Sequence, residues 1–384
     1  MQKQVFARVL ALGLAMLLLL IASTSLADES MPADMAGAKA AVLAEQTGGN
    51  SVAALKADEK MEVGGLSRLP ALLAVCEGMD QGLITLNASI TVSEAASRIK
   101  GPTAFLSAYE IIDAASLLKA AVMITAGDAI YALAEAIYGS ATACQQRMQE
   151  RLSELGVEAY YNNLMDTDIR LSANDLVAIG RALMQSPSFT SYSGLFYDSI
   201  THADGRVTEL ASSNRLLKSS VGCVGVATGS STSAGYCGVF SVSRGGMAWI
   251  CAIVGAPNSA ARITAASGLI DYGFAAYEVK TLARQEQVLV DSISVLGARR
   301  SSVALVAGQD AMLLIPRGTG HEAQWELPDV LKAPLFSQEA VGNVRYVNDF
   351  GEELCLVELL PAEDVPEARL ADYTLLVLAG WIHG

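Results

Sequence analysis

Histidine and cysteine, the side chains that most often bind catalytic metals or act as nucleophiles, form no recognisable site motif in this sequence, and histidine is scarce. The three histidines, His202, His321 and His383, lie in separate regions, and none stands beside an acidic or cysteine partner at metal-ligand spacing. This pattern argues against a catalytic zinc site and against a Ser-His-Asp triad. We expect each histidine to be a surface or turn residue, and we expect neither a metal nor a cofactor.

The cysteines give no signature of metal or redox chemistry. None of the six forms a C-x-x-C pair, so neither a zinc ribbon nor a thioredoxin-type site is indicated. Cys223, Cys237 and Cys251 are evenly spaced in a strand-rich stretch, where a cross-strand disulfide is the alternative to buried free thiols. Buried thiols are the commoner outcome, and we expect them here.

The N-terminus predicts export. Lys3 and Arg8 precede an apolar run from Val9 to Ile21, and Ser25-Leu26-Ala27 then supplies small residues around a cleavage point. This is the pattern of a secretory signal peptide. The run is shorter than the roughly 20 residues that a helix needs to span a bilayer. We therefore expect cleavage after Ala27 and a mature protein in the cell envelope or outside the cell, with an uncleaved N-terminal anchor as the alternative.

The net charge limits the possible partners, and the chain length suggests the number of domains. The formal net charge of −14 argues against a nucleic-acid partner and gives no general attraction to anionic lipid. A chain of 384 residues has room for two domains after the signal peptide. The change in composition near Tyr277 predicts a main domain over 28–276, a small β-rich domain over 277–372 and a short apolar tail over 373–384.

The hydrophobic pattern of the first domain predicts strands, then helices, then strands and a last helix. That order implies a sheet whose first and last strands come from both ends of the domain. The predicted strands are Ala40–Leu43, Val52–Leu55, Val221–Val226, Gly235–Ser243 and Met247–Val254. The predicted helices are Asp113–Ile124, Asp128–Tyr138, Ala141–Leu155, Asn174–Met184 after a Ser172/Asp175 capping box, and Ala260–Tyr272.

One further helix begins near Leu66, where apolar residues recur every three or four positions, and Gly78 is expected to end it. Ser67 is expected to cap its N-terminus, since Pro70 has no backbone N–H to lose there. The second domain is expected to consist of short strands, at Gln287–Val295, Ser302–Val306, Met312–Ile315 and Leu354–Leu360.

Short motifs along nearly the whole chain resemble one protein family in sequence and in order. They are Thr91-Val92-Ser93-Glu94-Ala95, Leu117-Leu118-Lys119, Gly127-Asp128-Ala129, Ala132–Glu135, Gly139-Ser140, Leu155-Gly156, Ser172–Leu176, Asn214–Leu217, Gly225, Thr228-Gly229, Ala234–Cys237, Lys332-Ala333-Pro334 and Val341-Gly342. The family is the serine D-Ala-D-Ala carboxypeptidases of peptidoglycan, the low-molecular-mass penicillin-binding proteins of peptidase family S11. The resemblance implies an α/β (α+β) transpeptidase fold like that of β-lactamases, followed by a small β domain.

The family's chemistry is acyl transfer at three motifs, S-x-x-K, S-x-N and K-T-G. A serine attacks the D-Ala-D-Ala carbonyl, a lysine amine takes its proton and backbone N–H groups hold the oxyanion. The resemblance places the serine at Gly65 and the lysine at Arg68. Glycine has no nucleophile, and arginine stays protonated at neutral pH. Ser67, two positions beyond, is the alternative nucleophile.

The other two motifs are also altered. The second aligns with Thr125-Ala126-Gly127, which keeps a hydroxyl and loses the asparagine. The third aligns with Ala227-Thr228-Gly229, which keeps Thr-Gly and loses the cation. The groove candidates are therefore Ser67, Thr125, Thr228 and Gly229, and no catalytic set is intact.

Three functional hypotheses follow from the resemblance. The first is a pseudoenzyme that binds peptidoglycan stem peptides or docks an envelope protein. The second is an active serine carboxypeptidase that uses a non-standard nucleophile such as Ser67, and the third is a structural partner of an active homologue. Membrane contact, if any, would be peripheral and would use Tyr373 to Ile382, which is too short to span a bilayer.

Overall fold

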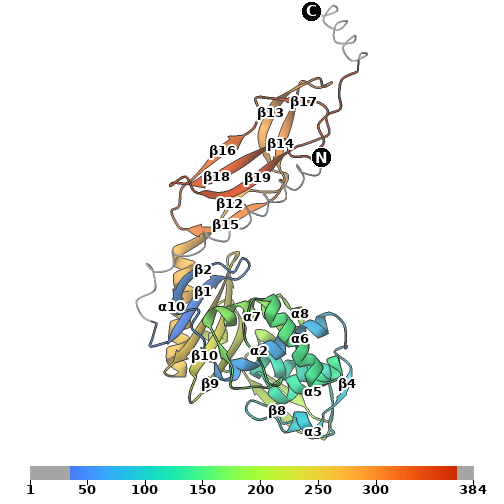
Figure 1. Cartoon of the computed structure of the whole chain (residues 1–384), viewed down its shortest axis with the longest axis vertical. Coiled ribbons are helices and arrows are strands. Elements are labelled where there is room, and N and C mark those ends of the chain that lie inside the picture. The colour runs from blue at the N-terminus through green and yellow to red at the C-terminus, as the bar shows by residue number, and fades with distance from the viewer. Residues whose placement is uncertain (1–34, 370–384) are drawn as a thin grey trace, which may run out of the picture. The chain divides into compact units, whose positions relative to one another are not determined.

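The computed structural model describes residues 35–369, which form two compact units that divide between Gly273 and Phe274. Each unit is described separately (Figure 1). Within residues 35–369, no helix is both long and apolar enough to cross a membrane. The predicted signal peptide at 1–27 and the apolar stretch at 373–382 lie outside the described residues.

A five-stranded antiparallel sheet is the centre of the first unit, with the strand order β2-β1-β11-β10-β9. The register of β1 against β11 pairs Ala40 with Val254, so the two ends of the unit meet in the middle of the sheet, as predicted. The predicted N-terminal hairpin is also confirmed. The strands are β1 (Ala40–Glu45), β2 (Ser51–Leu55), β9 (Cys223–Ser231), β10 (Gly235–Arg244) and β11 (Met247–Ala256).

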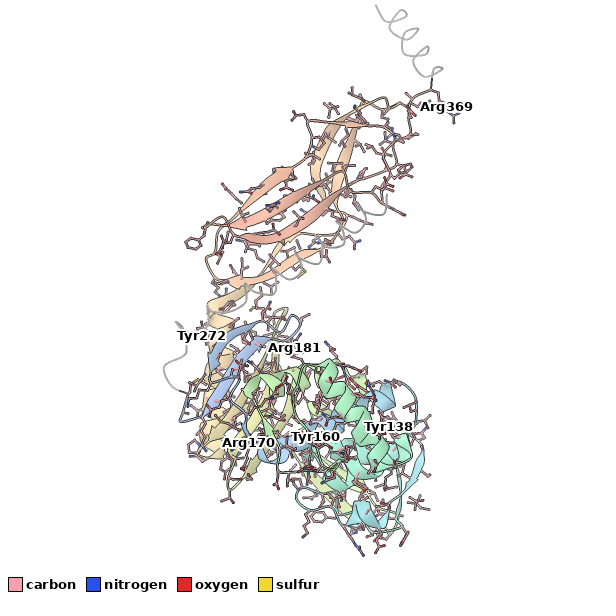
Figure 2. The ribbon with its side chains drawn as sticks, in the orientation of Figure 1. Tyr138, Tyr160, Arg170, Arg181, Tyr272 and Arg369 are labelled. Atoms are coloured by element: carbon pink, nitrogen blue, oxygen red, sulfur yellow. The ribbon has the colours of Figure 1, made fainter. Side chains whose placement is uncertain are left out.

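Helices cover both faces of this sheet (Figure 1). On one face lies α7 (Ala173–Gln185), which opens with the predicted capping box. Its Arg181 donates a 2.7 Å hydrogen bond to the carbonyl of Gln46 at the β1–β2 turn (Figure 2). On the other face, α10 (Ser259–Ala276) comes so close that a Cβ on Gly273 would lie 2.7 Å from the ring of Trp249. The tight approach of both helices explains why the central strands are almost wholly buried.

A cluster of helices packs beyond α7 and forms the larger part of the core. The helices are α2 (Leu69–Asp80), α4 (Ala114–Ile124), α5 (Gly127–Tyr138), α6 (Ala141–Glu154) and α8 (Pro187–Ser193). The predicted helices α4, α5 and α6 are present with ends within one residue, α2 begins three residues later than predicted, and α8 was not predicted. The helix α2 lies at their centre, and most of its residues are buried on all sides.

The prediction that Gly78 ends α2 is wrong, because the helix continues to Asp80. A Cβ on Gly78 would lie 2.6 Å from Ile137 and 2.9 Å from the hydroxyl of Tyr138, both on α5. Tyr138, on the helical side of the unit (Figure 2), also donates a 2.7 Å hydrogen bond to the carbonyl of Ala74. Glycine is needed here for close contact between two helices, not for a helix end.

The prediction that Ser67 caps α2 is also wrong. The chain enters α2 through a 3-10 helix, η1 (Gly64–Arg68), and Ser67 lies inside this turn. Arg68 occupies the cap position without a side-chain cap bond. Gly64, with φ of +55°, lets the turn begin against the backbone of Ser230 on β9, where a Cβ would come within 2.8 Å. Contact with the sheet edge therefore overrides the local capping preference.

Short elements complete the first unit. Three two-stranded sheets are present: β3 (Met61–Glu62) with β6 (Arg170–Leu171), β4 (Ser89–Thr91) with β5 (Ile111–Asp113), and β7 (Tyr197–Thr201) with β8 (Val207–Ala211). The short helices are α3 (Glu94–Ser97) and α9 (Leu216–Ser219).

The second unit consists of strands around a hydrophobic core of its own. A six-stranded sheet has the order β16-β18-β19-β14-β13-β17, and β12 pairs with β15. The four predicted strands correspond to β13, β14, β15 and β19. The strands are β12 (Tyr277–Ala283), β13 (Val288–Leu296), β14 (Ser302–Ala307), β15 (Ala311–Pro316), β16 (His321–Glu326), β17 (Val330–Lys332), β18 (Gly342–Asn348) and β19 (Glu353–Pro361).

All six cysteines are free thiols in the structure. Cys223, Cys237 and Cys251 lie on three adjacent strands, but none of them faces another across a strand pair. Burial raises the pKa of most of these thiols, as it does for Cys144, whose pKa is about 12. These thiols therefore stay protonated at neutral pH.

Candidate functional site

A cavity of about 510 Å³ in the first unit lies along the edge strand β9. It is closed by η1, by the turn between α4 and α5, by β8 and by the start of α10. Five of the residues singled out from the sequence line it together: Gly65, Thr125, Ala227, Thr228 and Gly229. Ser67, Arg68 and Gly127 are absent from its lining.

The wall between η1 and β9 is built from backbone. A Cβ on Gly229 would lie 2.8 Å from the amide nitrogen of Leu66 and 2.9 Å from that of Gly65, so only glycine fits at this point of the strand. Gly65 is different, because its nearest neighbour, the Cα of Gly229, would be at an ordinary 3.6 Å from a new Cβ. Position 65 thus has room for a side chain that the sequence does not supply.

Arg68 lies behind the cavity wall, where its guanidinium holds backbone carbonyls. It donates to Pro102 at 2.9 Å and to Thr125 at 3.1 Å, and it also contacts the carbonyl of Lys100. Burial lowers the pKa of Arg68, and the charge of Asp128 acts in the opposite direction. The guanidinium remains protonated, so it serves as a donor to carbonyls and not as a base.

The guanidinium of Arg68 fills the space that a side chain at position 127 would need. A Cβ on Gly127 would lie 2.8 Å from the Cζ atom of Arg68 and 2.7 Å from Ile99. Such distances are shorter than packed side chains adopt, so a larger residue at 127 requires the guanidinium to move. Arg68 can therefore adopt this position because residue 127 is a glycine.

Ser67 is buried and does not line the cavity. Only 1% of the residue is exposed, and its Oγ has no hydrogen-bond partner among the described residues. Its carbonyl accepts a 2.9 Å hydrogen bond from the hydroxyl of Tyr161. Neither a substrate nor a proton acceptor can reach this hydroxyl in the observed arrangement.

Two hydroxyl groups singled out from the sequence do border the cavity. Thr125 adopts the left-handed conformation at the C-terminus of α4, with φ of 50°, and donates a 2.7 Å hydrogen bond to the carbonyl of Ile124. Thr228 shares a 2.5 Å hydrogen bond with the hydroxyl of Ser213. These groups can bind a polar ligand, but neither adjoins a lysine or histidine in the cavity lining within residues 35–369.

Arg262, on α10, is a functional candidate that the sequence reasoning missed. It lines the cavity although only 3% of it is exposed. Its guanidinium donates to the carbonyl of Cys237 at 3.0 Å, with longer contacts to Gly229 at 3.3 Å and Ser213 at 3.5 Å. Burial lowers its pKa. The available signal was that Arg262 is the one basic residue in the sequence of α10.

Arg262 has no carboxylate partner among the residues that the structure describes; its hydrogen bonds go to carbonyls and to the hydroxyl of Ser259. A buried cation without a counter-charge is costly. The cavity therefore contains a positive charge that an anionic ligand would neutralise.

The loop 101–110 borders the cavity through Pro102, Thr103 and Phe105. The buried carboxylate of Asp128 holds this loop by accepting hydrogen bonds from the amides of Ala104 at 2.8 Å and Leu106 at 3.1 Å. Arg68 thus holds the loop through a backbone carbonyl, and Asp128 holds it through backbone amides.

His202 begins the turn between β7 and β8, where its carbonyl accepts a 2.9 Å hydrogen bond from the amide of Gly205, so of the expected surface or turn positions it has the turn position. It is buried, with ring nitrogens 2.5 Å from the Glu110 carboxylate and 2.8 Å from the Thr208 hydroxyl. These contacts connect the loop 101–110 to β8. The burial of His202 was not evident from the sequence, because Glu110 is 92 residues away and local spacing could not reveal the contact. His321 is exposed, and His383 lies outside the described residues.

Within residues 35–369, no group of three or more histidine, cysteine, aspartate or glutamate side chains is arranged to hold a metal ion. The cavity itself presents one acidic side chain, Glu209 on β8.

Two family patterns match the chain. Residues 27–258 match the family described as D-alanyl-D-alanine carboxypeptidase, and residues 277–367 match the C-terminal domain of penicillin-binding protein 5. Among curated relatives, the D-alanyl-D-alanine carboxypeptidase DacF of Bacillus subtilis is 25% identical over 351 residues and covers 90% of each chain. DacC of Escherichia coli is 26% identical over 399 residues, with 97% of this chain and 96% of the relative covered.

Solved structures show the same fold. Penicillin-binding protein 5 of Haemophilus influenzae superimposes with a TM-score of 0.70 and 24% identity, over 86% of this chain and 98% of that one. A peptidoglycan synthesis regulatory factor (PBP3) of Streptococcus pneumoniae has a TM-score of 0.68 and 23% identity, over 85% and 99% of the two chains. The predicted fold class, a transpeptidase-like α/β domain followed by a small β domain, is confirmed.

Proposed function

The chain belongs to the D-alanyl-D-alanine carboxypeptidase family, and from this membership we propose that it is a catalytically degenerate member. In this proposal it binds peptidoglycan stem peptides that end in D-Ala-D-Ala and does not cleave them. We also propose that it is exported, with a mature N-terminus at Asp28, which N-terminal sequencing of the purified native protein can test.

The proposed loss of catalysis follows from what acyl transfer requires. A serine hydroxyl needs a neighbouring base to accept its proton. Gly65 has no side chain, and the guanidinium of Arg68 is bound to backbone carbonyls behind the wall. Within the described residues, the cavity lining contains neither lysine nor histidine. Ser67, the alternative nucleophile, is buried outside the lining, so the geometry gives no support to the active-hydrolase hypothesis.

The unpaired buried charge of Arg262 is the observation that carries the binding proposal. A peptide ending in D-Ala-D-Ala has a terminal carboxylate, which would supply the missing counter-charge. Carboxylate and guanidinium form strong charge-assisted hydrogen bonds, and burial strengthens them. The guanidinium contacts the backbone carbonyl of Ser213, and the hydroxyls of Ser213 and Thr228, which are hydrogen-bonded to each other in the same cavity, are further groups that can bind the ligand.

The edge strand β9 supports the same pose. Its segment from Ala227 to Ser230 lines the cavity and lies at the edge of the sheet. An extended peptide can pair with such an edge through backbone hydrogen bonds. Gly229 and Gly65 keep this edge free of side chains, so the peptide backbone can approach closely.

The decisive experiment combines covalent labelling with equilibrium binding. We expect fluorescent penicillin to leave no label on the denatured protein, while an active carboxypeptidase treated in parallel is labelled. We expect a synthetic D-Ala-D-Ala peptide to bind without release of D-alanine, and Arg262→Gln to weaken this binding about ten-fold or more. Covalent label on the wild-type protein would refute the proposal. Absence of peptide binding would favour the structural-partner hypothesis.

A further inference from the structure

We propose that Glu209 makes this cavity selective for stem peptides that carry a free amine on the side chain of the residue two positions before the terminal D-alanine. Such peptides have not been cross-linked or acylated at that amine. The inference rests on the proposed function, because it assigns the second charged group of the same cavity.

Glu209 and Arg262 are the two charged residues among the described lining residues. Glu209 lies on β8, where alternate residues share a face, and both it and Ala211 line the cavity. The hydroxyl of Tyr197, on the neighbouring strand β7, is hydrogen-bonded to the Glu209 carboxylate. The carboxylate is therefore held at the cavity by its strand and by its neighbour.

The charge of Glu209 is available to a ligand. Among the ion pairs of the described residues, none includes Glu209, although neighbouring Asp198 pairs with Lys119 at 2.8 Å. The cavity thus presents one buried cation and one exposed anion on different elements. A ligand that matches both carries a carboxylate and an ammonium group.

The separation of the two charges along the chain has an upper limit that is compatible with a stem peptide. Ser213 accepts a 3.5 Å contact from Arg262. Glu209 lies four residues before Ser213, which corresponds to at most about 13 Å of extended chain. In an extended peptide, two residues span about 7 Å, and a four-carbon side chain adds about 6 Å. A peptide whose terminal carboxylate is bound at Arg262 is therefore long enough for an amine of its third-last residue to extend to Glu209.

The chemistry of that amine determines the selectivity. A free amine is protonated at neutral pH and forms an ion pair with Glu209. Once the amine is part of an amide, as in a cross-link, the charge is lost and the carboxylate gains no partner. Because Glu209 is solvent-exposed, its ion pair with the amine is weak to moderate in strength, and we expect a preference of about two- to five-fold for the free amine.

The test compares two synthetic peptides by isothermal titration calorimetry with the full-length mature protein. One is Nα-acetyl-L-Lys-D-Ala-D-Ala and the other is its Nα,Nε-diacetyl form. We expect the wild-type protein to bind the free-amine peptide about two- to five-fold more tightly, and Glu209→Gln to bind both equally. Glu322→Gln, which removes the same charge from exposed β16 in the second unit, should keep the wild-type ratio.

The two peptides and the variants together distinguish a failure of this inference from a failure of the proposed function. Equal binding of both peptides by wild type and Glu209→Gln would overturn the role of Glu209 and leave the proposed function standing. Binding of neither peptide would overturn both. Arg262→Gln should weaken both peptides to the same extent, since it removes the carboxylate contact and leaves the amine contact.

Discussion

At the scale of single residues, the replacements at positions 68 and 127 are sterically compatible with each other. Arg68 fills a volume that a side chain at position 127 would otherwise need, and Gly127 leaves that volume open. The guanidinium then uses its fixed fork of donors on carbonyls of two chain segments. Arginine suits this task because its donors are planar and permanently charged.

The pairing predicts strong non-additivity. We expect Gly127→Ala to destabilise the protein by about 1–3 kcal/mol, because the new Cβ clashes with Arg68 and Ile99. Combined with Arg68→Lys, the same change should cost less than the sum of the two single changes. Urea unfolding measures all three variants. Gly268→Ala in α10, where a Cβ meets nothing within 4 Å, is the control and should be neutral or slightly stabilising. Strict additivity would show that the two residues do not share space.

Restoration of acylation is the second residue-scale prediction. Gly65→Ser fits sterically, yet alone it should give no penicillin label, because Arg68 cannot take the serine proton. Groups that act as a unit in acyl transfer are strongly non-additive. The quadruple variant Gly65→Ser, Arg68→Lys, Gly127→Asn, Ala227→Lys should recover slow acylation.

Intact-mass spectrometry of wild type, single and quadruple variants reads out the covalent adduct. The quadruple variant should unfold at a urea concentration similar to wild type, which shows that a missing adduct is not a folding defect. A folded quadruple variant without adduct would show that the backbone of the cavity has diverged as well as its side chains.

At the scale of elements, the loop 101–110 depends on α5 more than on its own sequence. Asp128, in the first turn of α5, accepts the amides of Ala104 and Leu106, and it is only 1% exposed. Buried hydrogen bonds to a charged acceptor contribute about 1.5–3 kcal/mol each. The loop in turn supplies Thr103 and Phe105 to the cavity.

We therefore expect Asp128→Asn to lower the free energy of unfolding by about 2 kcal/mol or more, because the amide group loses the negative charge and one acceptor oxygen. Hydrogen exchange at Ala104 and Leu106 should increase in parallel. The matched control is Asp113→Asn at the exposed N-cap of α4, where asparagine caps as well as aspartate and the change should be near zero. Equal effects of the two variants would contradict the anchoring role.

At the scale of the whole molecule, each unit has its own core, and all residues that line the cavity belong to the first unit. A ligand that binds only the folded state stabilises by about 2.7 kcal/mol at a hundred times its Kd. For a unit of this size, one kcal/mol raises Tm by about 2–4 °C.

We expect scanning calorimetry to show two transitions, of which a D-Ala-D-Ala peptide at saturation raises one by about 5–10 °C. The other transition should stay in place, because its unit has no part of the cavity. The same peptide with a C-terminal amide lacks the carboxylate and should shift neither. A ligand-dependent shift of both transitions would mean that the units unfold as one.

The sequence by itself determined the order of the elements, the family resemblance and the absence of side chains such as serine and lysine at positions 65 and 68. These follow from local patterns of apolar residues, caps and short motifs, which need no knowledge of distant contacts. The capping box at Ser172 and the N-terminal hairpin are examples, since each depends on residues a few positions apart.

The tertiary structure alone decided which side chains share a site. Ser67 turned inward because η1 packs on β9, and Gly78 proved to be a helix contact because α5 crosses it. Arg262 on α10 and Glu209 on β8 line the same cavity, although they are far apart in the sequence. Burial and charge pairing depend on neighbours far away in the chain, so no local pattern could predict them.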